Sequence, residues 1–357
     1  MLIAVILLMA VLLFVLERKW IEWSQKAVKY LGSCDKRIAE PGEKVRFTAE
    51  LENHSKYLVT FTRLTVTNPN AATYVETKEW AGRPLIKSFR SWHVVERMDI
   101  LPHHKRSFCV DMSFSRRGCY QVGKVNVEVG DLLGIKEASD LHDAEEIVII
   151  PEHTRNKPAL DAFGGFLGDI SVRRFLYDDP VLTLGFRDYS GRDPMKSISW
   201  TQTAKAGKLQ VKVFDHTAEL NAVVMLNVEG ATEEEFEEIV RVARTVCQQL
   251  EQKKIPYGVC TNGDLTGQYG KVFSFPAGLG DKHFGEIMYA LGKAERICYY
   301  SFRYLVNKTI GNSRNGQAFI LITPPLTVDS TASAKTLQAA SGSQICILEC
   351  KEEVQEV

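Results

Sequence analysis

Residues 220–254, LNAVVMLNVEGATEEEFEEIVRVARTVCQQLEQKK, decide the fold class of the second half of the chain. Leu220–Leu226 is an apolar run of the kind that forms a strand buried on both faces of a sheet. Thr232 and Glu235 have the spacing of a capping box, which predicts that an amphipathic helix begins there and runs to about Lys253. A buried strand followed at once by an amphipathic helix predicts an α/β unit.

The same alternation of apolar runs and helical periodicity continues toward the end of the sequence. Because strands alternate with helices, the sequence predicts a parallel, doubly wound sheet, and we assign residues 216–357 to this α/β domain. The predicted elements after residue 254 are a strand at 256–261, a helix at 281–294, an apolar helix or helix pair at 295–307, a strand at 318–323, a helix at 330–340 and a strand at 344–349.

Upstream, residues 38–150 alternate apolar and polar side chains with the period of two that is typical of half-buried strands. Val45–Asn53 and Leu58–Val66 are the clearest runs, and turn residues separate them. Several short strands with regular turns predict an antiparallel β-sandwich at 38–155, whereas residues 156–215, which include a glycine-rich stretch, are predicted to be a linker. The other predicted strands are 91–95, 107–114, 118–129 and 146–150.

The first residues are unlike the rest of the chain. Met1–Leu16 has no charged or polar side chain, and basic residues follow from Arg18 onward. As a helix this run spans about 24 Å, slightly short of a bilayer core. We predict a transmembrane helix at 1–19 in contact with the lipid bilayer, followed by a juxtamembrane linker at 20–37. The basic flank predicts a single-pass protein of the cell membrane with the bulk of the chain cytoplasmic. A cleaved signal peptide and a buried core helix stay open as alternatives.

Composition excludes some classes of function. The 357 residues include 44 basic and 44 acidic side chains, so no net positive field would attract nucleic acid, and none is predicted as a partner. Eight cysteines are scattered rather than arranged as a disulfide framework, and several lie in apolar runs. They are predicted to be reduced thiols of the core.

The densest group of informative residues lies between 187 and 205, just upstream of the first buried strand of the α/β domain. Cations alternate there with aromatic and acidic residues, which is the pattern of a surface for an anionic partner. The alternative is a structural clamp, in which Arg187 and Asp193 form an ion pair and Trp200 packs against the sandwich; spacing alone favours the clamp. The candidate partner-docking residues are Arg187, Tyr189, Asp193, Lys196, Trp200 and Lys205.

This segment resembles the signature of the bacterial domain of unknown function 58 family, which reads roughly R-x-Y-x-x-G-D-x-x-R-x-I-x-W-x-x-x-A-R. Lys196 and Lys205 replace arginines of that pattern, and Arg192 stands at its glycine. A second resemblance lies upstream, where residues 116–120 (RRGCY) and 131–135 (DLLGI) are similar to the family's R-R-G-x-Y and D-P-F-G-L runs. The positions that match the signature are Arg187, Tyr189, Asp193, Lys196, Ile198, Trp200, Ala204 and Lys205.

The resemblance implies a membrane-attached protein made of a β-sandwich and a von Willebrand factor A-like α/β domain. It also implies association with a MoxR-type AAA+ ATPase in assembly or chaperone work, with no catalytic activity. A von Willebrand factor A metal site needs D-x-S-x-S after the first strand, and residues 227–231 read NVEGA here. Without the leading aspartate and both serines, no metal or cofactor is predicted.

The sequence therefore predicts a non-catalytic, membrane-anchored assembly protein that docks protein partners, with a MoxR-type AAA+ ATPase as the expected partner. The alternative is a ligand-binding or adhesion module with a degenerate metal site. An enzyme is not predicted, because no nucleophile is paired with a recognisable base and no metal cluster is visible. The sequence does not indicate an oligomeric state.

Overall fold

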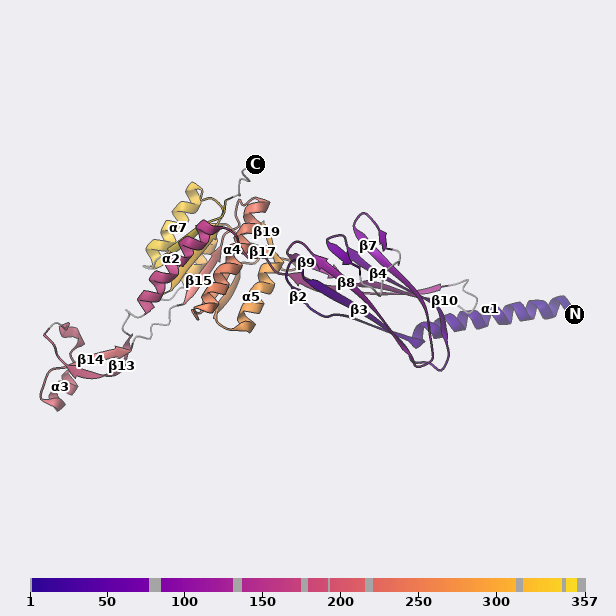
Figure 1. The fold of residues 1–357 in the computed structure, drawn as a ribbon, viewed down its shortest axis with the longest axis horizontal. Helices are drawn as coiled ribbons and strands as arrows, with labels where there is room; N and C mark the ends of the chain where they lie inside the picture. The colour runs from indigo at the N-terminus through magenta and orange to yellow at the C-terminus, as the bar shows by residue number, and fades with distance from the viewer. Residues whose placement is uncertain are drawn as a thin grey trace. The chain divides into compact units, whose positions relative to one another are not determined.

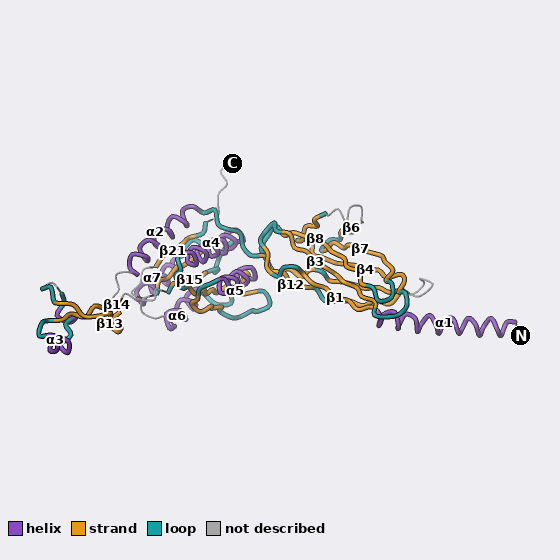
Figure 2. The backbone as a smooth tube through the Cα atoms, turned by 60° about the horizontal axis from the view of Figure 1, so that its bottom comes forward, coloured by secondary structure: helices purple, strands orange, loops and turns teal. Residues whose placement is uncertain are grey.

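The computed structural model describes residues 2–76, 85–130, 137–174, 179–191, 193–215, 221–312, 317–341 and 345–351. The chain divides into two compact units, Met1–Glu152 and His153–Val357, and each unit is described by itself (Figure 1). Figure 2 shows that strands dominate the first unit, whereas helices and strands are mixed in the second.

The first unit is a β-sandwich of two antiparallel sheets. Alternate residues of its long strands are buried, as the period of two requires, so that each sheet turns one face to a shared core. Phe47, Leu51 and Leu64 are among the fully buried side chains of this core. One sheet has the order β1 (Val28–Cys34), β3 (Lys44–Asn53), β8 (Lys105–Phe114), β5 (Ala72–Val75). The other has the order β11 (Glu137–His142), β10 (Lys124–Gly130), β4 (Val59–Pro69), β7 (Ser91–Ile100), β6 (Leu85–Lys87).

A third, small sheet closes one end of the sandwich and explains one error of the sequence prediction. Residues 118–129 were expected to form one strand, but they form two strands in different sheets, with Gly123 between them. Gly123 has φ +66°, its N–H donates to Asn68 Oδ1 at 2.8 Å, and a Cβ there would lie 2.2 Å from the Phe47 ring. Only glycine fits at this bend. The third sheet has the order β2 (Ile38–Ala39), β12 (Glu145–Ile149), β9 (Gly118–Val122).

The first helix, α1 (Leu2–Ala27), is longer than predicted and ends in the sandwich. Its last turns bury Ser24 and Ala27, and the rings of Trp23 and Tyr57 lie 5.3 Å apart. The His54 N–H donates to the Ala27 carbonyl at 2.9 Å. The segment that was predicted to be a juxtamembrane linker, 20–37, therefore contains the end of this helix and the edge strand β1.

The predicted membrane anchor is wrong. In the part of the chain that the structure describes, no helix combines the length and the apolar character that crossing a membrane requires. The apolar run of α1 stops at Leu16, and the charged residues Glu17, Arg18 and Lys19 follow inside the same helix. The prediction of a transmembrane helix at 1–19, and the single-pass membrane localisation that depended on it, are corrected accordingly.

The second unit is built on a five-stranded sheet. Four of its strands are parallel, and β18 pairs antiparallel at one edge. β20 is buried at every residue and β15 at all but one, as expected for strands covered on both faces. The sheet has the order β18 (Phe273–Gly278), β16 (Tyr257–Thr261), β15 (Ala222–Leu226), β20 (Ala318–Thr323), β21 (Ile345–Glu349).

Helices cover both faces of this sheet (Figure 2). α6 (Phe302–Asn312) and α7 (Val328–Ser341) share one apolar cluster with the sheet, and α4 (Glu233–Gln252) and α5 (Asp281–Lys293) pack on the opposite face. The capping box that was predicted to start α4 is confirmed, because Thr232 accepts from the Glu235 N–H and the Glu235 side chain accepts from the Thr232 N–H.

Two further parts of the second unit differ from the sequence prediction. The glycine-rich stretch expected in a linker lies in α2 (Lys157–Arg174), where Phe163, Phe166 and Leu167 form a buried face at helical spacing. Tertiary burial of this face outweighs the low helix propensity of glycine. Residues 294–298, expected to be helical, form β19 (Ala294–Cys298), because they find a partner strand in β17 (Gly263–Leu265).

The predicted fold class needs correction as a whole. The described residues form twenty-one strands in six sheets and seven α-helices, so the chain is richer in strands than the expected combination of a membrane helix, one sandwich and one α/β domain. Part of the difference lies at 156–215, where a linker was expected and the structure has a helix and a hairpin.

Candidate functional site

The six candidate docking residues all lie in one small substructure, which we call the signature hairpin. It consists of β13 (Asp179–Asp188), a single 3₁₀ turn η2 (Met195–Ser197), α3 (Trp200–Ala206) and β14 (Gln210–Asp215). β13 and β14 pair antiparallel, with Arg187 opposite Val211 and Asp188 opposite Gln210. The side chains of residues 185–191 and 193–212 are described.

A bidentate ion pair holds the turn of the hairpin. The Arg187 guanidinium donates to both carboxylate oxygens of Asp193, at 2.9 Å from Nη1 and 2.5 Å from Nη2. The Ser190 N–H and hydroxyl donate to Asp193 Oδ2 at 3.0 and 2.7 Å. The Arg187 guanidinium, helped by these Ser190 donors, holds the pKa of the Asp193 carboxyl well below its usual range. The turn is therefore ordered by polar contacts rather than by an apolar core.

A second set of hydrogen bonds joins the start of β14 to α3 and to the end of β13. The Gln210 N–H donates to Thr203 Oγ1 at 3.0 Å, and the Gln210 side-chain amide donates to Asp188 Oδ1. The Ser199 N–H donates to the Gln210 carbonyl at 2.8 Å. α3 ends at Gly207, whose φ of +68° is the left-handed conformation that glycine adopts without strain.

Large apolar side chains of the hairpin face the solvent. Among its described hydrophobic side chains, Ile198 and Val211 are buried, and the backbone of Ile198, just after η2, pairs with that of Val211 in β14. In contrast, Met195 is 71% exposed and Trp200 65% exposed. Of the predicted clamp, the Arg187–Asp193 pair is present within the second unit. The hairpin is thus ordered by polar contacts, while large apolar side chains on it stay exposed.

The structure brings the six candidate residues together but gives them different roles. Arg187 and Asp193 contact each other, and the backbone of Tyr189 donates to the Leu209 carbonyl at 2.9 Å. Lys196 and Lys205 are exposed, and no ion pair is recorded for either of them in the described part of the chain. Three candidates, Arg187, Tyr189 and Asp193, therefore make contacts within the hairpin, while Lys196, Trp200 and Lys205 are available at its surface.

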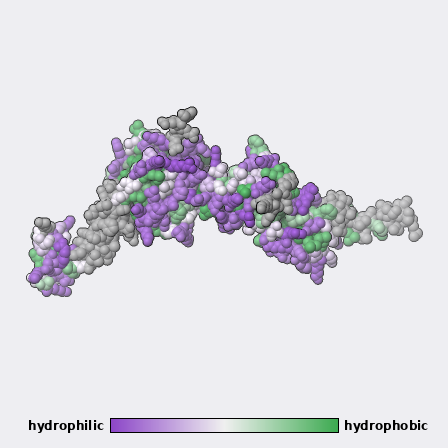
Figure 3. Space-filling model, in the orientation of Figure 1, coloured by the Kyte–Doolittle hydropathy of each residue, from purple (hydrophilic) through white to green (hydrophobic). Residues whose placement is uncertain are grey.

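Sequence reasoning missed three exposed apolar residues of the hairpin. Met195, Phe186 and Leu209 are exposed, and in Figure 3 the hairpin shows small hydrophobic areas on a mainly hydrophilic surface. Each of them is next to a charged residue in the sequence, at Lys196, Arg187 and Lys208, respectively. The sequence signal that could have predicted these exposed residues is an apolar residue next to a charged one, in a segment that has no strong periodicity.

A second concave region lies where the parallel strands β15 and β20 end; we call it the carboxyl-edge crevice. It has a volume of about 680 Å³ and is lined by the ends of these strands and the first turns of α6 and α7. Its position between β15 and β20 is where the strand order reverses, and crevices at this point commonly bind ligands in α/β sheets.

The floor of the crevice is an uncharged hydrogen-bond network around Asn227. Its side chain is 2% exposed, donates to Thr323 Oγ1 at 3.0 Å, and accepts from Asn262 Nδ2 at 3.1 Å. The Glu229 carboxylate accepts from the Phe302 N–H at 2.7 Å and so caps the start of α6. These groups tie strand ends and a helix together and leave few free ligand atoms. Among the described residues, no group of three or more His, Cys, Asp or Glu side chains is placed to hold a metal ion.

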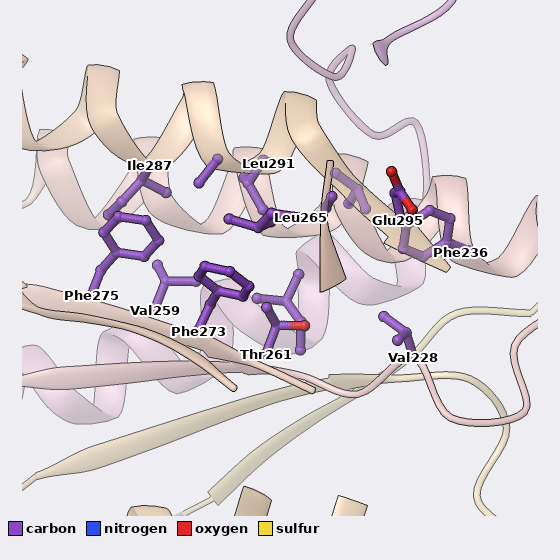
Figure 4. A pocket seen from close by; sticks show the side chains of 14 residues that line it. Val228, Phe236, Val259, Thr261, Leu265, Phe273, Phe275, Ile287, Leu291 and Glu295 are labelled. Carbon is purple, nitrogen blue, oxygen red and sulfur yellow. The ribbon is translucent and has the colours of Figure 1, made fainter. Parts of the chain in front are cut away.

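A separate cavity in the core of the second unit is small and apolar (Figure 4). Phe236, Val259, Leu265, Phe275 and Leu291 surround a space of about 20 Å³ between the sheet and the helices α4 and α5. Such a space is at most the size of one water molecule and offers it few polar partners. It is a packing defect of the core rather than a binding site.

The cysteines offer no activated nucleophile at the described sites. All eight are free thiols, and burial raises the pKa of Cys260 and of Cys346 to about 11. A thiol reacts through its thiolate, so a raised pKa makes these side chains poor nucleophiles near neutral pH.

Comparison with known proteins gives little further help. No family model matches the chain, and no curated protein matches it. Among solved structures, the chain is similar to the major pilin subunit of Bacillus cereus at 5% identity and a TM-score of 0.28, over 36% of this chain and 44% of the pilin. A non-cellulosomal cohesin from Archaeoglobus fulgidus is 14% identical, with a TM-score of 0.26, over 34% of this chain and 91% of the cohesin. A cohesin module from Clostridium perfringens is 10% identical, with a TM-score of 0.23, over 34% of this chain and 96% of the module.

TM-scores this low carry no argument about function. The predicted von Willebrand factor A-like class is corrected by the strand-rich architecture described above, and we describe the chain by its own sheets.

Proposed function

We propose that the chain is a non-catalytic docking component of protein assembly, and that the signature hairpin binds the protein partner. The observation that carries the proposal is that Trp200 and Met195 are 65% and 71% exposed on a hairpin whose turn is held by the Arg187–Asp193 pair. The resemblance to the domain of unknown function 58 family supports a MoxR-type AAA+ ATPase as the partner.

Two physical points support docking by this hairpin. Tryptophan is among the residues that contribute most to protein interfaces, because its large rigid ring buries much apolar area for little lost conformational entropy. Hydrogen bonds at the turn and at the start of β14 order the hairpin before binding, so less conformational entropy is lost when a partner binds.

The chemistry of the described residues supports the non-catalytic part of the proposal. The thiols carry raised pKa values where a shift is resolved, Asn227 in the crevice is uncharged and bonded to Thr323 and Asn262, and the carboxylate of Glu229 caps α6. General acid–base or nucleophilic catalysis needs an ionisable group poised near the working pH.

A second candidate function is ligand binding in the carboxyl-edge crevice. Its volume of about 680 Å³ lies within the usual range of ligand pockets. The lining offers hydroxyl and amide groups, for example Ser330 and Asn307, for polar contacts. A thermal-shift screen of polar metabolites against the chain tests this candidate, and Ser330→Leu should abolish any shift that arises in the crevice.

The docking proposal is tested by capture of a purified MoxR-type AAA+ ATPase from the same organism on the immobilised chain, with and without ATP. The double variant Lys196→Ala with Trp200→Ala removes one charge and one anchor ring, and we expect it to lower capture by at least about tenfold. Circular dichroism of the variant checks that the fold is kept.

The chain offers a matched control outside the hairpin. Lys87 is exposed and Phe89 is 91% exposed, so Lys87→Ala with Phe89→Ala removes the same kinds of side chain elsewhere. Equal loss of capture in both double variants, or undiminished capture by the hairpin variant, would count against docking at the signature hairpin. Absence of capture by the unaltered chain would remove the ATPase as the partner.

A further inference from the structure

The signature hairpin has a charge balance that differs from the rest of the chain. From Asp179 to Asp215 the sequence has six basic and four acidic residues. Those with described side chains are Arg187, Lys196, Lys205, Lys208 and Lys212, and Asp188 and Asp193. In the whole chain, basic and acidic residues are equal at 44 each. The basic excess is therefore local to the hairpin.

The two acidic side chains are already occupied inside the hairpin. Asp193 accepts four hydrogen bonds, from Arg187 and Ser190, and Asp188 accepts from the Gln210 side chain. Arg187 is neutralised in the same pair. Arg187 and Asp193 therefore neutralise each other, whereas Asp188, which is bonded by a neutral amide, and the lysines keep their charges.

Four lysines of the hairpin remain exposed at its surface. Lys196, Lys205, Lys208 and Lys212 are all exposed, and for none of them is an ion pair recorded within the described ranges. Lys196 follows Met195 in the sequence and Lys208 precedes Leu209, so cationic and apolar groups are interleaved. Such a surface is complementary to an acidic surface that contains an apolar recess.

We infer that the partner presents an acidic face, in which carboxylates surround an apolar recess that receives Trp200. This inference rests on the proposed docking function and adds the chemistry of the partner's surface to it. The lysines increase the rate of encounter through long-range attraction, and the exposed apolar residues slow dissociation by burying their surface.

An acidic protein face fits the hairpin better than nucleic acid does. Among the described side chains of the hairpin, the cations outside the Arg187–Asp193 pair are lysines, which lack the flat bidentate fork with which arginine reads phosphate and base edges. Met195 and Leu209 are flexible aliphatic side chains, so they bury well in a protein recess but cannot stack on bases as the exposed rings of Trp200 and Phe186 could. The equal numbers of acidic and basic residues in the chain also provide no general attraction to a polyanion.

The test measures the affinity of the full chain for the purified ATPase at low and at physiological salt. Lys196→Glu with Lys205→Glu reverses two charges of the hairpin. Lys282→Glu with Lys335→Glu makes the same change in net charge at two exposed lysines of α5 and α7. We expect the hairpin variant to lose about tenfold or more in affinity, mainly in the association rate, and the control to change little. The affinity of the unaltered chain should fall as salt rises.

The possible outcomes separate this inference from the function on which it rests. Binding that resists both salt and reversal of Lys196 and Lys205 would show that the partner's face is not acidic, while docking itself would stand. No binding of the ATPase by the unaltered chain would remove the ATPase as the partner and overturn the inference about its face. Binding of a single-stranded oligothymidine probe, more tightly than the ATPase and with the same dependence on Lys196 and Lys205, would overturn the acidic protein face in favour of nucleic acid.

Discussion

The parallel sheet of the second unit and the signature hairpin use apolar residues in opposite ways. In β20 every residue is buried, and Phe319 and Leu321 share one cluster with the helices α6 and α7. In the hairpin, Met195 and Trp200 are mostly exposed, and the turn is ordered by the Arg187–Asp193 pair. The sheet buries its apolar side chains in the core, which stabilises the fold, whereas the hairpin leaves large apolar side chains exposed to solvent.

This difference explains how a small hairpin is ordered while its apolar side chains stay available. Hydrogen bonds and ion pairs are directional, so they fix a backbone without covering neighbouring side chains. Apolar burial is non-directional and removes the surface that a partner would contact. A docking element ordered by polar contacts is therefore expected to tolerate loss of its exposed apolar residues, and a sheet ordered by burial is not.

The largest expected effect compares one apolar residue from each region. Leu321→Ala should lower the free energy of unfolding by about 2–5 kcal/mol, because it opens a cavity in a fully buried strand. Trp200→Ala, although it removes a larger side chain, should change stability by no more than about 0.5 kcal/mol, because the ring is exposed. Urea denaturation followed by circular dichroism measures both. A similar loss in the two variants would mean that Trp200 packs against another part of the protein.

A smaller effect distinguishes the starts of two helices. Thr232 caps α4 with its side chain, and Thr232→Ala should cost about 1 kcal/mol. Ser199 occupies the same position before α3, but its side chain makes no capping bond, and Ser199→Ala should stay within about 0.5 kcal/mol. The same denaturation experiment tests the pair. A larger cost at Ser199 than at Thr232 would show that the hydroxyl of Ser199 does more than the structure indicates.

The smallest effect is the pH dependence of the hairpin turn. Because the folded-state pKa of Asp193 is lowered, its contribution to stability is complete above the unfolded-state pKa of about 3.9 and is lost as pH falls through the lower folded-state pKa. The NMR resonance of the Ser190 N–H, which donates to Asp193, should therefore move only below about pH 3.9. Asp193→Asn should abolish this titration. A midpoint at or above the ordinary value would show that the pair with Arg187 does not persist in solution.

The elements that were predicted well are indicated by residues that lie within the element itself. The capping box at Thr232 is formed by residues three positions apart, and the strand of Ala318–Thr323 is a short apolar run that matches β20. The alternation at residues 45–53 likewise corresponds to β3. In each case the physical cause of the element lies within the element itself.

The elements that were predicted badly depend on partners distant in sequence. β19 forms because β17 lies beside it, and α2 forms because Phe163, Phe166 and Leu167 find a core to enter. The apolar start of α1 resembled a membrane segment, but the helix runs on through charged residues to Ala27 and ends against the sandwich. No window of the sequence contains these partners, so no local pattern could have indicated them.

At the candidate site, the pattern of residue types in the sequence was enough to locate the segment from Arg187 to Lys205. It also identified the residues able to form an ion pair. Tertiary structure decided how they are used: Arg187 and Asp193 contact each other because β13 and the turn bring them together, while Lys196, Trp200 and Lys205 stay exposed. The physical reason is that residue type limits which contacts are possible, but exposure depends on which other surfaces the folded chain brings near. For the same reason, the buried network at Asn227, which joins the ends of three strands through Thr323 and Asn262, was decided only by the fold.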